Sequence, residues 1–108
     1  MENMREIEFV QTCPACPEQY DVYIDKFWVG YIRLRWGWLS CGYGINGRNP
    51  IDGKCLIAHR FDDRYKGCFE GDERREWLYK CKMALLKRYE KDLKRKKTVK
   101  ACNKVTYD

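Results

Sequence analysis

The sequence has no long apolar segment and no secretory signal pattern at its start. None of its apolar runs approaches the roughly 20 residues that are needed to cross a bilayer. The first six residues contain no apolar core, and Glu2 and Glu6 stand where a secretory signal is basic. We therefore expect a protein with no membrane contact that works in the cytoplasm.

Histidine is scarce, and the residue sets of a catalytic centre are missing. His59 is the only histidine, and its neighbours Ile57 and Phe61 favour a position at the edge of the core. No Ser/His/Asp, Cys/His or paired-carboxylate set has a spacing that indicates catalysis. The glycine-rich segment 42–53 lacks the Gly-Lys-Ser/Thr ending of a phosphate-binding P-loop. We expect no enzymatic activity.

The chain does contain enough apolar material for one core. Hydrophobic residues make up 44% of its 108 residues, a length that normally forms one domain. Four tryptophans and eight tyrosines are many for this length, and three of the tryptophans lie within residues 28–38. The composition therefore predicts a single folded domain organised around this aromatic stretch.

Alternating side chains between residues 20 and 43 predict a meander of short antiparallel strands. Within residues 28–36 one parity is apolar and contains Trp28, Ile32, Leu34 and Trp36. The other parity, together with the preceding strand, carries aromatic and basic side chains: Tyr23, Tyr31, Arg33 and Arg35. Successive side chains of a strand point to opposite faces, so the sheet should have one apolar face and one cationic, aromatic face. These four residues are the first candidate contacts of a partner, because aromatic and guanidinium groups can stack on bases or bind phosphate and carboxylate. The bland alternative is an ordinary solvated polar face.

The segment 72–97 has the pattern of one long helix. Apolar residues recur at the three- and four-residue spacing of a helical face: Trp77, Leu78, Cys81, Leu85 and Tyr89. Asp72 and Glu73 offer an N-cap and first-turn carboxylates that suit the positive end of the helix dipole. Beyond Tyr89 the apolar stripe weakens, so the last turns should project into solvent.

These elements predict an α+β fold in which a small antiparallel sheet of four or five strands packs on one long C-terminal helix. Residues 1–97 form the domain, with the sheet over about 6–61 and the helix over about 72–97, and residues 98–108 form a basic tail. The expected core residues are Trp28, Ile32, Leu34, Trp36, Leu39, Ile57, Phe61, Trp77, Leu78, Leu85 and Tyr89.

Positive charge is concentrated near the C-terminus. The net charge is +6, and residues 87–104 contain nine Lys or Arg against two acids. A projecting basic helix can neutralise phosphates, and its candidate contacts are Lys87, Arg88, Lys91, Lys94 and Arg95. A solubilising terminus is the alternative interpretation.

The seven cysteines allow a metal site or packed free thiols as the main interpretations. A disulfide framework would require export and would leave one of the seven thiols unpaired. Redox chemistry would require a helix directly after Cys16, where a proline and a strand follow instead. Cys13-Pro14-Ala15-Cys16 resembles a zinc-ribbon knuckle, in which a tight turn brings two sulfurs to one Zn²⁺. No second Cys-X-X-Cys follows, and Pro17 stands where the knuckle usually has glycine. In a reducing compartment, free cysteine instead packs as a small hydrophobe, as the apolar positions of Cys41, Cys55, Cys68 and Cys81 suggest.

The chain resembles the compact accessory proteins of bacteriophages, including anti-CRISPR and other anti-defence inhibitors. The resemblance rests on its small size, the Tyr-Ile-Arg-Leu-Arg-Trp-Gly strand and the basic helical end. The resemblance implies a stoichiometric inhibitor that binds a protein or ribonucleoprotein of the bacterial host and blocks it by occlusion. Two alternatives stay open: a nucleic-acid-binding module that uses the basic helix, and a sponge in which Arg33, Arg35 or Arg48 traps an anionic nucleotide beside a tyrosine.

Overall fold

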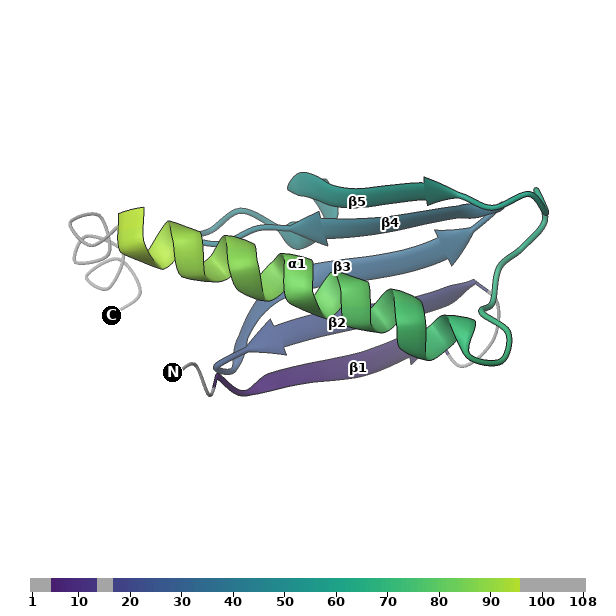
Figure 1. Cartoon of the computed structure of the whole chain (residues 1–108). Coiled ribbons are helices and arrows are strands. Elements are labelled where there is room, and N and C mark those ends of the chain that lie inside the picture. The colour runs from purple at the N-terminus through teal and green to yellow at the C-terminus, as the bar shows by residue number, and fades with distance from the viewer. Residues whose placement is uncertain (1–4, 14–16, 96–108) are drawn as a thin grey trace.

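The computed structural model describes residues 5–13 and 17–95, and it contains one five-stranded antiparallel sheet (Figure 1). Each strand pairs with the next along the chain, as in a simple meander. The strands are β1 (Ile7–Cys13), β2 (Glu18–Ile24), β3 (Phe27–Arg35), β4 (Trp38–Tyr43) and β5 (Lys54–Arg60). A short 3-10 helix (Pro50–Asp52) and the long helix α1 (Glu73–Arg95) complete the fold. The α+β prediction is confirmed.

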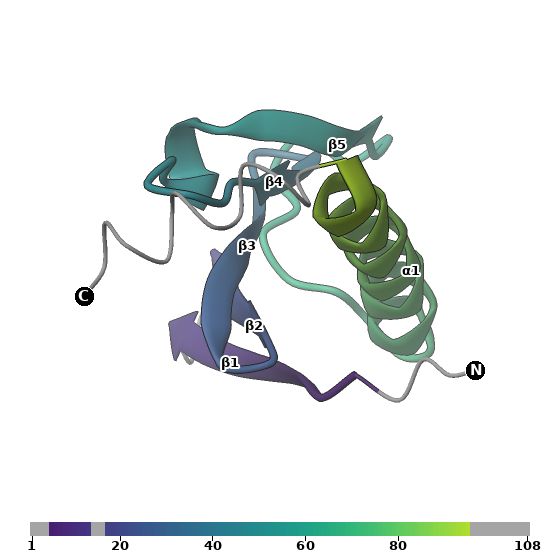
Figure 2. The same ribbon diagram turned by 90° about the vertical axis from the view of Figure 1, so that its left-hand side faces the viewer.

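Helix α1 covers one face of the sheet, and the sheet curves around it (Figure 2). The core lies between the two layers and is built from alternate residues of the strands and one stripe of the helix. Its buried members include Tyr20, Val22, Ile24, Ile32, Leu34, Leu39, Cys41, Tyr43, Phe69, Cys81, Leu85 and Tyr89. Ile57, Phe61, Trp77 and Leu78 are partly buried against this core, as expected for its border. No described helix is long and apolar enough to cross a membrane.

Trp28 is not on the apolar face, so its assignment to the core is wrong. Val22 pairs with Gly30, but Tyr23 pairs with Trp28, which leaves Val29 as the extra residue of a β-bulge. The bulge reverses the parity of the strand, and Trp28 joins Tyr23 on the face away from α1. Its indole N–H donates to the Gly30 carbonyl at 3.0 Å.

Trp36 is also outside the core, because the strand ends before it. Trp36 and Gly37 form the two-residue turn between β3 and β4, and both have positive φ angles, 53° and 76°. Type I′ hairpin turns require this conformation at both central residues. Trp36 is 59% exposed in this turn. The apolar alternation of the strand therefore does not extend to Trp36 and does not predict the burial of its side chain.

The glycine-rich segment between β4 and β5 folds back over the sheet on the side away from α1. Pro50 is buried there, and a Cβ atom on Gly42 would lie 2.3 Å from the Pro50 carbonyl oxygen. Gly42 therefore permits a close backbone approach that any side chain would prevent. This segment therefore covers part of the sheet face that points away from α1.

The cysteines occupy three different environments. Cys41 and Cys81 are free and fully buried where α1 meets the sheet, as the packing interpretation expects. The hydrogen bond with Cys81 and the burial raise the pKa of the Cys41 thiol. Cys55 is exposed, because a register shift pairs it with Gly42 and turns it away from α1. Cys68 is disulfide-bonded. Cys55 is therefore free, as expected, but it is not packed in the core. For Cys68 the expectation of a free thiol is wrong.

We expect Cys81→Ser to lower the free energy of unfolding by about 1–3 kcal/mol, because it places a hydroxyl in an apolar contact between helix and sheet. The control Cys55→Ser changes an exposed residue and should cost no more than about 0.5 kcal/mol. Urea denaturation followed by tryptophan fluorescence measures both values. Equal costs would contradict the placement of Cys81 in the core.

Candidate functional site

The face of the sheet that points away from α1, called the outer face below, carries a row of three side chains from three strands. Arg35 of β3 pairs with Trp38 of β4, and Trp38 pairs in turn with Arg60 of β5. Directly paired residues project from the same face, and neighbouring strands lie about 4.8 Å apart. Trp38 therefore has an arginine on each side. Arg35, Trp38 and Arg60 are called the Arg–Trp–Arg row below.

Arg33 and Tyr31 continue the outer face behind this row. Arg33 lies between Gln19 of β2 and Ser40 of β4. Tyr31 lies opposite Asp21, and its hydroxyl donates to Gln19 Oε1 at 3.1 Å. The basic and aromatic residues of β3 thus lie on one face of the sheet. They lie beside residues of β4 and β5 that the sequence pattern did not indicate.

Two tryptophan rings at this end of the sheet are open to solvent. Trp38 is 46% exposed and Trp36, in the adjoining turn, is 59% exposed. The guanidinium carbon of Arg60 lies 5.1 Å from the centroid of the Trp38 ring, and that of Arg35 lies 6.0 Å from the Trp36 ring. These cation–π contacts hold the arginines beside the rings and leave their hydrogen-bond donors available.

In the part of the chain that the structure describes, no carboxylate forms an ion pair with Arg33, Arg35 or Arg60. Asp63, just beyond β5, uses its carboxylate to accept the Tyr65 backbone N–H at 2.9 Å. The surface is therefore cationic and aromatic together, which suits an anionic partner with planar groups.

Tyr23 and Arg48, which the sequence also offered as contacts, lie at the far end of the sheet. Tyr23 pairs with Trp28 beside the turn between β2 and β3. Arg48 is exposed in the segment that follows β4, whereas the Arg–Trp–Arg row lies where β4 begins. The length of β4 thus separates Arg48 from Arg35, which disfavours joint contact of the two with one small ligand.

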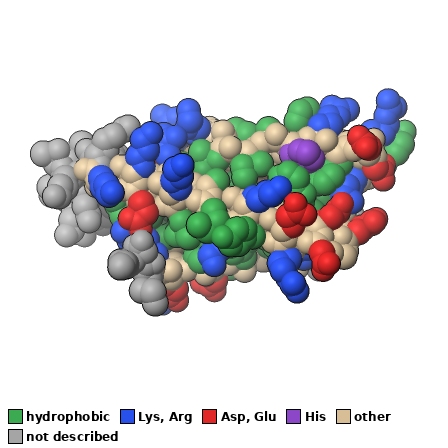
Figure 3. Space-filling model, viewed as in Figure 1, with side chains coloured by type: hydrophobic (Ala, Val, Ile, Leu, Met, Phe, Trp, Pro, Cys, Tyr) green, Lys and Arg blue, Asp and Glu red, His purple; other side chains and the backbone are tan. Residues whose placement is uncertain are grey.

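A second cationic surface lies on α1. Lys87, Lys91 and Lys94 recur at helical spacing, are exposed, and form no ion pair among the described residues. On the side of the molecule that carries α1, acidic side chains gather toward the start of the helix and basic ones toward its end (Figure 3). Because α1 covers the inner face of the sheet, the lysines and the Arg–Trp–Arg row lie on opposite sides of the molecule.

The other predicted basic contacts of α1 are not part of this lysine surface. Arg88 lies 3.4 Å from the carboxylate of Asp92, and its guanidinium carbon lies 5.7 Å from the centroid of the Tyr43 ring. Asp92 is buried and accepts the Tyr43 hydroxyl at 2.9 Å. Burial and this hydrogen bond raise the pKa of Tyr43. Arg88 therefore supports the fold, and the side chain of Arg95 lies outside the described residues.

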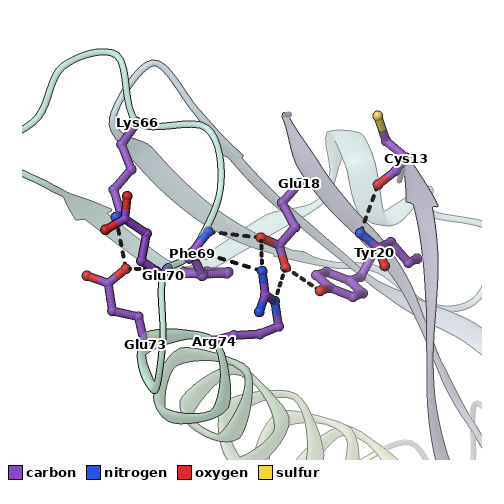
Figure 4. Close-up of polar contacts among 9 residues, drawn as sticks. Cys13, Glu18, Tyr20, Lys66, Phe69, Glu70, Glu73 and Arg74 are labelled. Atoms are coloured by element: carbon purple, nitrogen blue, oxygen red, sulfur yellow. Dashed lines mark hydrogen bonds and ion pairs between the residues drawn. The ribbon is translucent and has the colours of Figure 1, made fainter. Parts of the chain in front are cut away.

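Glu18 is a buried carboxylate that joins three parts of the chain (Figure 4). It is only 2% exposed, and it accepts hydrogen bonds from the Tyr20 hydroxyl and, at 2.9 Å, from the Phe69 N–H. Arg74 in the first turns of α1 donates to it from Nε at 2.7 Å and from Nη2 at 3.2 Å. β2, the segment before the helix and the helix itself thus meet at one side chain.

The hydrogen bonds around Glu18 favour a structural role for this cluster. Burial alone would raise its pKa, but the hydrogen bonds from Arg74, Tyr20 and Phe69 outweigh burial and hold the pKa below its ordinary value. Burial and the adjacent carboxylate raise the pKa of Tyr20 to about 12. Near neutral pH neither group exchanges a proton readily, so the pair is unsuited to general acid–base catalysis.

Sequence reasoning did not single out Glu18, although a signal for it was present. Glu18 shares the parity of Tyr20, Val22 and Ile24, which all face the core. A charged residue on an apolar parity is the pattern of a buried carboxylate that needs a cationic partner. The partner, Arg74, could not be chosen from the many basic residues of the chain without the docking of α1.

The zinc prediction for Cys13 and Cys16 stays a prediction. Cys13 is a free thiol at the end of β1, and Cys16 lies outside the described residues. The described residues contain no group of three or more His, Cys, Asp or Glu side chains that could hold a metal ion. Comparison of the chain with protein family models, curated proteins and solved structures found no match.

We expect Glu18→Gln to lower the free energy of unfolding by about 2–4 kcal/mol, because it leaves the half-exposed Arg74 without its carboxylate and disturbs a buried set of donors. The control Glu76→Gln removes an exposed pairing with Lys80 on the same helix and should cost at most about 0.5 kcal/mol. Chemical denaturation at neutral pH compares the two variants, and similar losses would contradict the role of Glu18.

Acid should weaken the same contact. The pKa of Glu18 is lower in the folded than in the unfolded chain, so its contribution to stability is present above the ordinary carboxyl pKa of about 4.3. The contribution is lost as the pH falls through the folded pKa. The difference in unfolding free energy between the native chain and Glu18→Gln should therefore shrink from pH 7 to about pH 3. An unchanged difference would show that the charge of Glu18 is not what stabilises the fold.

Trp36→Asn should raise the free energy of unfolding by about 0.5 kcal/mol, because asparagine tolerates positive φ better than a bulky aromatic residue. The exposed edge contact between Trp36 and Tyr65, with ring centroids 6.5 Å apart, offsets part of this gain. Thermal and urea denaturation measure the change. A clear loss of stability would mean that the Trp36 ring serves the fold.

Proposed function

We propose that this protein is a non-catalytic binding protein that holds a macromolecular partner on the outer face of its sheet and blocks that partner by occlusion. The observation that carries the proposal is the Arg–Trp–Arg row, with Arg33 behind it and Trp36 beside it. Three arginines that form no ion pair with any described carboxylate and two exposed tryptophan rings gather at one end of the sheet. Tryptophan, tyrosine and arginine are the residues that most often dominate binding energy at interfaces.

The stability of the fold does not explain why these arginine and tryptophan side chains gather on the outer face. The core is complete on the other face, where α1 covers the apolar residues of β2, β3 and β4. Trp36 and Trp38 leave large apolar surfaces in water, which is unfavourable for the isolated chain. A contiguous exposed patch of this kind supports an interaction site.

Ion pairs hold both ends of α1 on the sheet, which supports occlusion rather than a conformational mechanism. Glu18 and Arg74 fix the start of α1, and Arg5 contacts both Asp25 and Glu90 at the other end of the helix. A preorganised surface loses little entropy when it binds. In line with the resemblance to phage anti-defence proteins, we propose a protein or ribonucleoprotein of a bacterial host as the target.

A nucleic-acid-binding module that uses α1 is the second candidate function. Lys87, Lys91 and Lys94 favour it, because they are exposed on one helical face and lack ion pairs among the described residues. The nucleotide sponge is the weakest candidate, since Arg48 lies apart from Arg33 and Arg35.

Site-specific photocrosslinking in cells tests the proposed function. A benzophenone amino acid in place of Ala58, an exposed residue of the outer face, should give a defined adduct. The same probe in place of Tyr79, exposed on α1, is the control and should not. Arg33→Glu with Arg35→Glu should abolish the Ala58 adduct and leave the melting temperature nearly unchanged. An adduct from Tyr79 alone, or one that survives the charge reversal, would move the binding surface away from the outer face.

A further inference from the structure

We infer that the ligand of the outer face is a single-stranded nucleic acid, whose bases stack on Trp38 and Trp36 while Arg33, Arg35 and Arg60 contact its phosphates. The inference rests on the proposed function: of the two targets proposed there, it selects a ribonucleoprotein, and it names an unpaired stretch of nucleic acid as the part that the outer face contacts. It also moves the nucleic-acid contact from the basic helix, where the charge of the sequence suggested it, to the opposite side of the molecule.

The spacing of the Arg–Trp–Arg row fits a chain of alternating bases and phosphates. Arg35 and Arg60 flank Trp38 on the two neighbouring strands, so their backbones are separated by about 10 Å, twice the distance between strands. One base on the Trp38 ring therefore has a guanidinium group within reach on each side. Aromatic platforms that are bordered by cations bind single strands with little sequence preference.

The charge of this surface favours nucleic acid over an ordinary protein surface. Arg33, Arg35 and Arg60 have no carboxylate partner among the described residues. A bound partner must therefore supply several anionic groups at short intervals, together with flat apolar surfaces for the rings. A single strand offers both, because each nucleotide has one phosphate and one base with open π-faces.

A duplex fits this surface less well than a single strand. The sheet curves around α1, so the outer face is convex in the direction that runs across the strands (Figure 2). The faces of the bases are stacked within a duplex, and its grooves accept a helix or a narrow ribbon rather than a broad convex sheet. Only an unpaired base can stack its flat face on the ring of Trp36 or Trp38.

The conformation of Trp36 is independent support. The residue sits at φ 53° in a turn position where asparagine, aspartate or glycine is normally found. A bulky aromatic residue is strained there, and its ring is open to solvent. Local strain at an exposed ring points to a role in binding rather than in folding.

The basic stripe of α1 lacks this combination. Lys87, Lys91 and Lys94 can neutralise phosphates, but the nearest exposed aromatic residue of the described helix is Tyr79, two turns away from Lys87. Such a surface binds by charge alone. Stacking therefore distinguishes the two surfaces experimentally.

The test measures fluorescence anisotropy of the full chain with a fluorescein-labelled oligo(dT) of about 12 nucleotides. Trp38→Ala should weaken the affinity by about 5- to 150-fold, the usual range for removal of one base-stacking ring. The matched control is Phe27→Ala, which truncates an exposed ring at the other end of β3 and should change the affinity less than twofold. Trp36→Asn should weaken binding although it does not destabilise the fold.

Charge variants complete the test. Arg35→Gln and Arg60→Gln should each reduce the slope of log affinity against log salt by about 0.7, the value for one phosphate contact of a single strand. Arg75→Gln removes the same charge from an exposed position of α1 and should leave the slope unchanged. Inorganic polyphosphate should bind without quenching the tryptophan emission, whereas oligo(dT) should quench it.

The inference and the proposed function fail in different ways. If oligo(dT) binds and the triple variant Lys87→Gln, Lys91→Gln, Lys94→Gln abolishes binding while Trp38→Ala does not, the nucleic-acid site belongs to α1 and the inference is overturned. If no oligonucleotide binds at low salt but the Ala58 probe still gives a protease-sensitive adduct, the partner is a protein and only the inference fails. If neither is observed, the outer face is not a binding surface and both fail.

Discussion

The ion pair between the buried Glu18 and the half-exposed Arg74 is the interaction on which the rest of this structure depends. It joins β2 to the start of α1, and the Glu18 carboxylate also accepts a hydrogen bond from the N–H of Phe69 in the connecting segment. An ionised carboxylate in the core is tolerable only while all of these donors are in place. The contact therefore fixes one position of the helix on the sheet, and Arg5 and Asp92 fix the other end of the helix.

The docking of α1 buries one face of the sheet and leaves the opposite face, the outer face, uncovered by the helix. The inner face buries the aliphatic residues of three strands against Cys81, Leu85 and Tyr89. The outer face then needs no apolar cover, and the exposed rings of Trp36 and Trp38 are unexplained by stability. Together with their arginine neighbours, these rings form the surface that we propose binds a partner with anionic and planar groups.

The sequence pattern predicts those features that depend on neighbours along one strand or helix. Parity placed Ile32 and Leu34 in the core and Arg33 and Arg35 on the opposite face. It failed for Trp28, because a bulge is set by pairing with β2 and leaves no mark within β3 itself. It missed Arg60 and Trp38 as partners, because only the register of β4 and β5 brings them side by side. The same holds for Arg74, whose role depends on where the helix docks.

The indole N–H signals of the four tryptophans offer the most direct test of the binding face. Two-dimensional NMR during titration with oligo(dT) reports on each ring separately. The signals of Trp36 and Trp38 should shift or broaden together. The signals of Trp28 and Trp77 should stay in place, because the Trp28 indole is hydrogen-bonded to the Gly30 carbonyl and the centroid of the Trp77 ring lies 4.4 Å from that of His59. Shifts confined to backbone signals of α1, with Trp36 and Trp38 unchanged, would contradict the account.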